Sequence, residues 1–199
     1  METHNNIEIL KIAISSAVTL LGVFLSWFLK YKWGEYKHRK VTREITQSKL
    51  IQTVLEQQLH EYGAQRAFIL QRHNGGKFKT GRSMNKLSTT FEALEEGVST
   101  EFKEYQNLPT TLYSGLIDSV QTERGIFPIV DDIDDILTKA FFVQRGTKSA
   151  IVYPINKGVE LIGVVGFEWT HKLEKSIEQS YVQYKQDGKL IGETLSKLL

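Results

Sequence analysis

Apolar residues dominate the chain between Ile12 and Leu29, where the sequence IAISSAVTLLGVFLSWFL contains no charged residue. As a helix this run would be about 27 Å long, close to the roughly 30 Å thickness of a bilayer's hydrocarbon core. Aromatic and basic side chains follow it, as is typical of the boundary between lipid and water. The side chains predicted to lie at this interface are Trp27, Lys30, Tyr31, Lys32 and Trp33. The pattern predicts one transmembrane helix over residues 9–30, after a short extracytoplasmic tail of residues 1–8.

Positive charge is distributed unevenly around this predicted helix. Lys11 is the only Lys or Arg before residue 30, whereas basic residues recur between residues 30 and 49. The positive-inside rule therefore predicts a single-pass protein of the inner (cell) membrane whose C-terminal domain is cytoplasmic. A cleaved signal peptide fits less well, because the acidic residues Glu2 and Glu8 precede the apolar run and no small-residue cleavage site follows it.

Helical spacing of apolar residues continues beyond the basic segment. The stripe consists of Val41, Ile45, Leu50, Ile51, Val54, Leu55 and Leu59. It predicts that residues 31–62 form a basic juxtamembrane and amphipathic helix that packs on a globular domain of residues 63–199. Pairing of two such helices in a coiled-coil dimer is the alternative.

Within residues 63–199 short strands and helices alternate. A strand over 67–70 leads to Asn74-Gly75, a strong turn signal. A second strand or loop to about residue 87, helices over 92–105 and 112–120, and an edge strand over 126–130 are expected to follow. The acidic cluster 131–135 precedes a helix that ends near Arg145. Because the spacing of a calcium loop is missing, we interpret this cluster as the start of the helix.

The clearest pattern in the domain is a β-hairpin. Two β-rich segments, Ser149–Ile155 and Glu160–Trp169, flank the turn sequence Asn156-Lys157-Gly158. A last amphipathic helix is expected from Leu173 onward. The fold class is therefore α/β (α+β), with a central, mostly antiparallel sheet flanked by N- and C-terminal helices.

Composition excludes several kinds of site. The chain has 199 residues and no cysteine, so disulfides, thiolate zinc sites and cysteine nucleophiles are absent. The sequence contains no phosphate-binding loop, nucleophile elbow or zinc-binding helix. We therefore expect no catalytic residues, no metal, no cofactor and no nucleic-acid partner, and we interpret the protein as a non-enzyme.

One local patch of charge is candidate chemistry. No acidic residue occurs between Tyr62 and Glu92, while basic residues recur there. Backbone N–H groups at the predicted Asn-Gly turn are suited to form an anion-binding nest. The predicted ligand-binding residues, for an anionic small molecule or nucleotide, are Arg72, His73, Asn74, Gly75, Lys77, Lys79 and Arg82. The alternative is a solvated basic loop that faces acidic lipid.

The domain resembles a GAF domain, a small ligand-sensing fold related to PAS. The resemblance rests on the leading helix, on the strand before Asn74-Gly75, and above all on the hairpin Tyr153-Pro154-Ile155…Gly158…Leu161-Ile162-Gly163-Val164-Val165-Gly166. It implies a membrane-anchored module for small-molecule sensing or protein interaction. The chain ends after its last helix, so signalling is expected to need a separate output protein or a homo-oligomer.

The layout also resembles that of T-even phage holins. Shared features are one N-terminal span, a basic and tyrosine-rich exit, an amphipathic helix and a small α/β domain with a terminal helix. This resemblance implies an alternative function, in which membrane oligomers form lesions for host lysis and the domain is periplasmic.

Overall fold

The computed structural model describes residues 2–122, 125–127, 129–173 and 178–199, excluding the side chains of residues 2–14, 178–183 and 185. By their contacts the residues form two compact units, 1–46 and 47–199. Helix α1, Glu2–Tyr62, runs through the first unit and into the second. The first unit is helical throughout its described residues, and the second contains the sheet.

The apolar side chains of the first unit are exposed. Val18, Phe24 and Trp27 are 62–66% exposed, and the other large apolar residues up to Leu29 are also open to the surroundings. Further along α1 the exposed polar groups pair with each other, as Lys32 does with Glu35. No described contact within this unit therefore covers the apolar part of the helix.

The transmembrane helix predicted over residues 9–30 is not confirmed. Among the residues that the structure describes, no helix is both long and apolar enough to cross a membrane. Residues 9–14, with which the prediction begins, have side chains outside this description.

The second unit is built on a six-stranded sheet with the order β3-β2-β1-β6-β5-β4. The pairings between neighbouring strands are all antiparallel, which confirms the predicted sheet type. The strands are β1 (Arg66–Lys77), β2 (Ser83–Leu94), β3 (Leu108–Pro109), β4 (Ile126–Phe127), β5 (Ser149–Lys157) and β6 (Glu160–Trp169).

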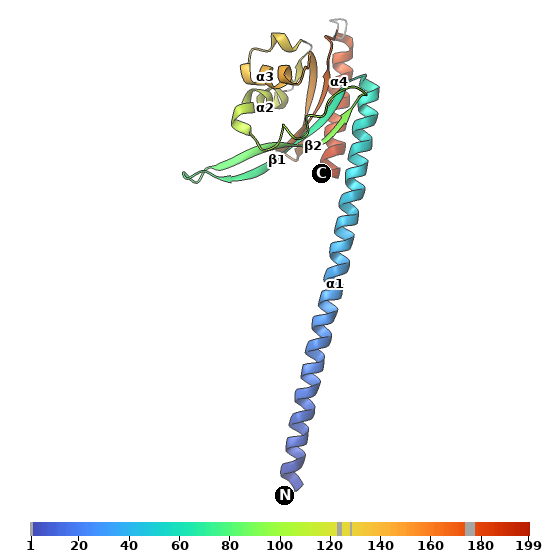
Figure 1. Ribbon diagram of the computed structural model, residues 1–199, viewed down its shortest axis with the longest axis vertical. Coiled ribbons are helices and arrows are strands. Elements are labelled where there is room, and N and C mark those ends of the chain that lie inside the picture. The colour runs from blue at the N-terminus through green and yellow to red at the C-terminus, as the bar shows by residue number, and fades with distance from the viewer. Residues whose placement is uncertain (1, 123–124, 128, 174–177) are drawn as a thin grey trace. The chain divides into compact units, whose positions relative to one another are not determined.

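Helices cover both faces of this sheet (Figure 1). On one face, Ile51, Leu55 and Leu59 of α1 pack with Ile191 and Leu195 of α4, Glu178–Leu198. This arrangement confirms that the amphipathic helix packs on the domain. The opposite face carries α2 (Ser114–Gln121), α3 (Ile136–Gln144) and two short 3-10 helices, η1 (Thr110–Tyr113) and η2 (Val130–Asp132). Their core is rich in aromatic rings.

Several predicted elements are confirmed. The hairpin of β5 and β6 turns at Gly158, whose φ of 63° suits glycine. Helix α3 begins as the acidic cluster indicates, because Asp135 accepts a hydrogen bond from the Thr138 N–H at 2.7 Å. Strand β4 lies at the sheet edge as predicted, but it covers only Ile126–Phe127 of the expected 126–130, because η2 begins at Val130; residue 128 is outside the described residues. Residues 174–177 of the predicted final helix also lie outside the described residues.

Two local predictions are wrong. Asn74-Gly75 is not a turn, because β1 continues through it to Lys77 and the chain reverses at residues 78–82. The helix predicted over 92–105 is instead the end of β2 followed by a loop. The Glu92 carboxylate holds this loop, since it accepts hydrogen bonds from Thr100 Oγ1 and from the Glu101 N–H.

Candidate functional site

The outer edge of β5 is only partly covered by another strand. Strand β4 pairs with β5 at two positions, Ile126 with Ile151 and Phe127 with Ala150. One step further, the Val152 N–H donates to the Gly125 carbonyl at 2.6 Å. Pro154 then lacks an N–H, so it cannot continue this ladder. Beyond it this edge of β5 pairs with no described strand, and the Asn156 carbonyl accepts a hydrogen bond from Ser196 of α4 instead.

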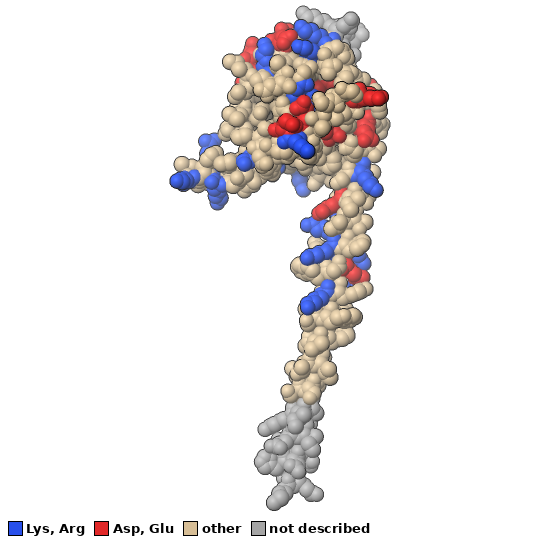
Figure 2. All heavy atoms as spheres, in the orientation of Figure 1, with Lys and Arg blue, Asp and Glu red and all other residues tan. Residues whose placement is uncertain are grey.

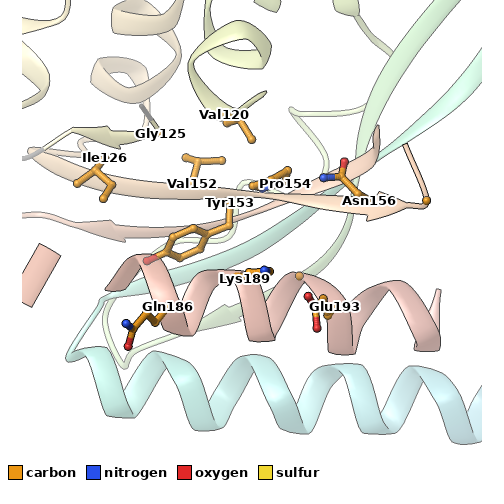
Figure 3. A pocket seen from close by; sticks show the side chains of 12 residues that line it. Val120, Gly125, Ile126, Val152, Tyr153, Pro154, Asn156, Gln186, Lys189 and Glu193 are labelled. Atoms are coloured by element: carbon orange, nitrogen blue, oxygen red, sulfur yellow. The ribbon is translucent and has the colours of Figure 1, made fainter. Parts of the chain in front are cut away.

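A groove of about 720 Å³ lies along this open edge. We call it the β5 groove. Its walls come from the end of α2, from β4 and β5, and from one side of α4, as Figure 3 shows. The lining residues are Val120, Gly125, Ile126, Val152, Tyr153, Pro154, Asn156, Gly158, Gln186, Lys189, Gly192 and Glu193. Its volume lies in the range of small-molecule sites in proteins.

Two glycines bring α4 close to β5 beside the groove. A Cβ atom at Gly188 would lie 2.1 Å from Cδ1 and Cε1 of Tyr153, and one at Gly192 would lie 2.5 Å from the Pro154 carbonyl oxygen. Further along, Ser196 Oγ donates to the Asn156 carbonyl at 2.6 Å. The glycine spacing therefore serves close packing of α4 against β5.

The groove combines an apolar wall with polar groups. Val152 and Pro154 lie on the α2 side of β5, whereas the ring of Tyr153 extends toward α4 (Figure 3). Lys189 and Glu193 provide charged groups on the exposed side of α4. Such a site suits a small amphipathic molecule, because the apolar wall provides contact area and a few polar groups fix orientation.

Tyr153 links the groove to the end of α1. Tyr62, the last residue of α1, stacks edge-on with Phe167 at 4.7 Å and with Tyr184 of α4 at 5.1 Å between ring centroids. Burial raises the pKa values of Tyr62 and Tyr153 well above the ordinary tyrosine range, and the charge of Asp187 adds to the rise. Both phenols are therefore neutral at physiological pH.

A buried network of ionic side chains lies at the other end of the sheet. Glu168 of β6, 2% exposed, contacts Arg66 Nη1 at 2.7 Å and Arg145 Nε at 2.8 Å. Arg66 also lies 3.4 Å from Glu92 and 3.8 Å from Glu101. The network joins the strand core to the loop after β2.

The second arginine of this network is enclosed by rings. The Arg145 guanidinium carbon lies 4.7 Å from the ring centroid of Phe68, 4.5 Å from that of Tyr105 and 5.0 Å from that of Phe141. Its Nη1 and Nη2 atoms have no hydrogen-bond partner among the described residues. Cation–π attraction stabilises the charge there. Because Arg66, Arg145 and Glu168 are all buried, we interpret the network as structural.

The predicted anion-binding residues lie on the hairpin of β1 and β2, outside the lining of the β5 groove. Some of them make contacts within the fold. Arg72 Nη1 donates to the Leu161 carbonyl and lies 3.6 Å from Glu160. His73 Nε2 lies 2.8 Å from Ser88 Oγ, and Asn74 accepts from the Gly76 N–H. The Lys86 side chain covers the position that a Gly75 side chain would take.

The other three predicted residues, Lys77, Lys79 and Arg82, lie at the exposed end of the hairpin. Arg66, also basic, is buried in the ionic network. The anion site therefore stays a prediction, and it is restricted to the end of the hairpin. The residues predicted at a membrane interface lie on the first unit, where Trp27 and Trp33 are exposed.

No protein-family model matches the chain, and no curated protein matches it. Solved structures do. The GAF domain region of a predicted membrane protein from Geobacter sulfurreducens PCA is 13% identical, with 81% of this chain and 99% of that chain covered at a TM-score of 0.55. At these identities the likeness shows the fold alone.

Two further GAF domains of solved structure are also similar. The phycocyanobilin-bound GAF domain of a cyanobacterial phytochrome is 15% identical, with 80% of this chain and 92% of that chain covered at a TM-score of 0.55. The GAF domain of Thermosynechococcus elongatus PixJ, in its blue-light-absorbing form, is 9% identical, with 79% of this chain and 89% of that chain covered at a TM-score of 0.56. The predicted GAF fold is thus confirmed, and none of the comparisons supports the resemblance to holins.

Proposed function

We propose that this chain is a non-enzymatic sensing module that binds a small amphipathic molecule in the β5 groove. The observation that carries the proposal is the groove itself, with its apolar wall and the charged groups Lys189 and Glu193. The fold supports it, because the phytochrome domain of similar structure is bound to phycocyanobilin. Since this chain has no cysteine, its ligand would be held without a thioether or disulfide link.

The groove offers a route for a signal to both flanking helices. A ligand that contacts Tyr153 pushes on a ring that packs against Gly188 of α4 and lies in the cluster with Tyr62 of α1. Small shifts in a closely packed region are passed on to its neighbours, since they cannot be absorbed by empty space. Ligand binding is therefore expected to change the packing of α4 and of the end of α1, and thereby contact with an output protein or a second copy.

The test uses the full chain with labelled isoleucine methyl groups and the aromatic anion 8-anilinonaphthalene-1-sulfonate as probe. Saturable shifts of the Ile126 methyl signal, with little change at the buried Ile51, are expected from binding in the groove. Gln186→Trp fills the groove and should weaken this binding at least tenfold. Leu190→Trp is the matched control, because Leu190 lies on the same helix and is 65% exposed but does not line the groove. Unchanged Ile126 shifts, or equal loss in both variants, would contradict the proposal.

We propose in addition that the module is attached to a membrane by the apolar part of α1. The support is the exposure of Val18, Phe24 and the neighbouring apolar side chains, and the aromatic and basic residues that follow, including Trp27 and Lys30. A helix segment that is apolar on all sides is stable only when something apolar covers it. A bilayer meets this requirement, and the excess of Lys and Arg after the segment favours a cytoplasmic domain.

Membrane attachment is tested by flotation of the full chain with lysate membranes after an alkaline carbonate wash. We expect the chain to stay with the membranes, and Leu21→Lys with Phe24→Lys to release it. The control pair is Val159→Lys with Leu190→Lys, two exposed positions on the sheet-containing unit. Release of the unaltered chain by the wash would refute the attachment, and reporter fusions at both ends would check the orientation.

A further inference from the structure

The hairpin of β1 and β2 extends beyond the rest of the sheet. Pairing of β1 with β6 ends at Gln71 and Gly163, whereas pairing of β1 with β2 continues to Lys77 and Ser83. On its other side β2 pairs with β3 only as far as Lys86. Residues 74–85 therefore form a two-stranded arm, which stands out from the domain in Figure 1. We call it the β1–β2 arm.

The end of the arm is a closed turn with an exposed aromatic side chain. The Phe78 N–H donates to the Arg82 carbonyl at 2.9 Å, and the Gly81 N–H donates to the Phe78 carbonyl at 2.8 Å. These bonds define the backbone, yet the Phe78 side chain is 46% exposed and belongs to neither described core cluster. The exposed part of this ring, at the end of a projecting hairpin, is available to a partner.

Basic residues are the sequence neighbours of this ring. Lys77, Lys79 and Arg82 are exposed, and none of them has an ion pair within the described part of the chain. No acidic residue lies in the whole sequence from residue 63 to 91. Figure 2 shows Lys and Arg side chains gathered at the end of the arm. The arm thus offers three uncompensated positive charges and one apolar ring at a single point.

We infer that the β1–β2 arm binds the surface of an anionic phospholipid bilayer. Phe78 enters the interface between head groups and acyl chains, while Lys77, Lys79 and Arg82 contact the phosphate groups. Amphipathic insertion together with basic attraction is the combination that holds proteins on anionic membranes. A single-stranded nucleic acid is a poorer match, because base recognition uses several aromatic rings and the arm has one. The inference gives the predicted anion site a ligand class and does not depend on the β5 groove.

The experiment uses the absence of cysteine from the chain. Thr80, exposed in the turn, is changed to cysteine and labelled with the environment-sensitive fluorophore NBD, so that Phe78 is retained. The labelled full chain is reconstituted with vesicles of phosphatidylcholine alone or mixed with phosphatidylglycerol. Val159→Cys, in the turn between β5 and β6, is the control position because its side chain is fully exposed.

We expect the label at residue 80 to shift to the blue and to be shielded from iodide on vesicles that contain phosphatidylglycerol, but not on neutral vesicles. Changing Lys77, Lys79 and Arg82 to Gln together should lower this association on the order of 100-fold, at roughly fivefold per cation. Phe78→Ala should lower it less and should remove the blue shift. The label at residue 159 should respond to neither vesicle.

Three results would overturn the inference. One is equal quenching by iodide of the label at residue 80 on both kinds of vesicle. Another is an unchanged response of this label to phosphatidylglycerol after Lys77, Lys79 and Arg82 are replaced. The third is a spectral change with inorganic phosphate or a single-stranded oligonucleotide that matches the change with lipid. Failure of the proposed α1 attachment is seen separately, because the chain would then not sediment with neutral vesicles, while arm-dependent binding to anionic ones would remain.

Discussion

Replacement of Gly188 by alanine tests the close packing of α4 on β5. The added Cβ would lie 2.1 Å from two ring carbons of Tyr153, whereas carbon atoms in contact are separated by about 3.5–4.0 Å. At least ~1.4 Å of movement is therefore required of either the ring or the helix. The ring is enclosed by Phe167 and α4, so it cannot turn aside freely.

The size of the effect follows from two opposing contributions. Overpacking of this kind costs about 1–3 kcal/mol. Replacing glycine by alanine inside a helix contributes about 1 kcal/mol in the other direction. We expect the Gly188→Ala variant to lose up to about 2 kcal/mol in the free energy of unfolding, as the difference between these contributions.

The assay is urea unfolding of the full chain followed by circular dichroism, in a double-mutant cycle with Tyr153→Ala. Removal of the ring removes the clash, so in that background Gly188→Ala should be neutral or stabilising by up to about 1 kcal/mol. If Gly188→Ala destabilises both backgrounds equally, the Tyr153 contact is not the cause. If it stabilises the unaltered chain, the close approach of α4 is refuted.

Two further predictions concern buried groups. Glu168→Gln should destabilise the fold by about 3–5 kcal/mol in urea unfolding, because it removes the buried charge that faces Arg66 and Arg145. The control, Glu160→Gln, removes one partner of an exposed ion pair with Arg72 and should cost less than about 1 kcal/mol. Similar losses in the two variants would contradict the stabilising role of the network. Because burial raises the pKa of Tyr153 in the folded state, the stability that its neutral phenol contributes is complete below about pH 10 and is lost as the pH rises above that value. Unfolding measured between pH 8 and about pH 12 should therefore show a steeper alkaline loss in the unaltered chain than in Tyr153→Phe, and parallel curves would refute the assignment.

Local patterns predicted much of the fold because many elements depend on local chemistry. The hairpin of β5 and β6 and the capped start of α3 use turn and cap residues that lie next to the elements they define. Asn74-Gly75 misled for the opposite reason: cross-strand pairing with β2 carried the strand through a favourable turn sequence. The turn propensity of Asn74-Gly75 was therefore outweighed by the backbone hydrogen bonds between β1 and β2.

The candidate site was not predictable from neighbours in sequence. The β5 groove combines residues from α2, β4, β5 and α4, which only the folded sheet brings together. A partial signal existed in Gly188 and Gly192, whose spacing of four residues places both on one side of a helix. Likewise the partners Arg66 and Glu168 are joined only because β1 and β6 are neighbours in the sheet.

The two outermost strands bear on how copies of this protein can meet. Both β3 and β4 are two residues long, and the open edge of β5 carries Pro154 where a further strand would need a donor. Short edges and prolines prevent the sheets of separate molecules from joining into one continuous sheet. At these two edges the sheet of one copy is thus hindered from joining that of another, whereas the β1–β2 arm keeps strand edges beyond Gln71 and Lys86 that pair with no described strand.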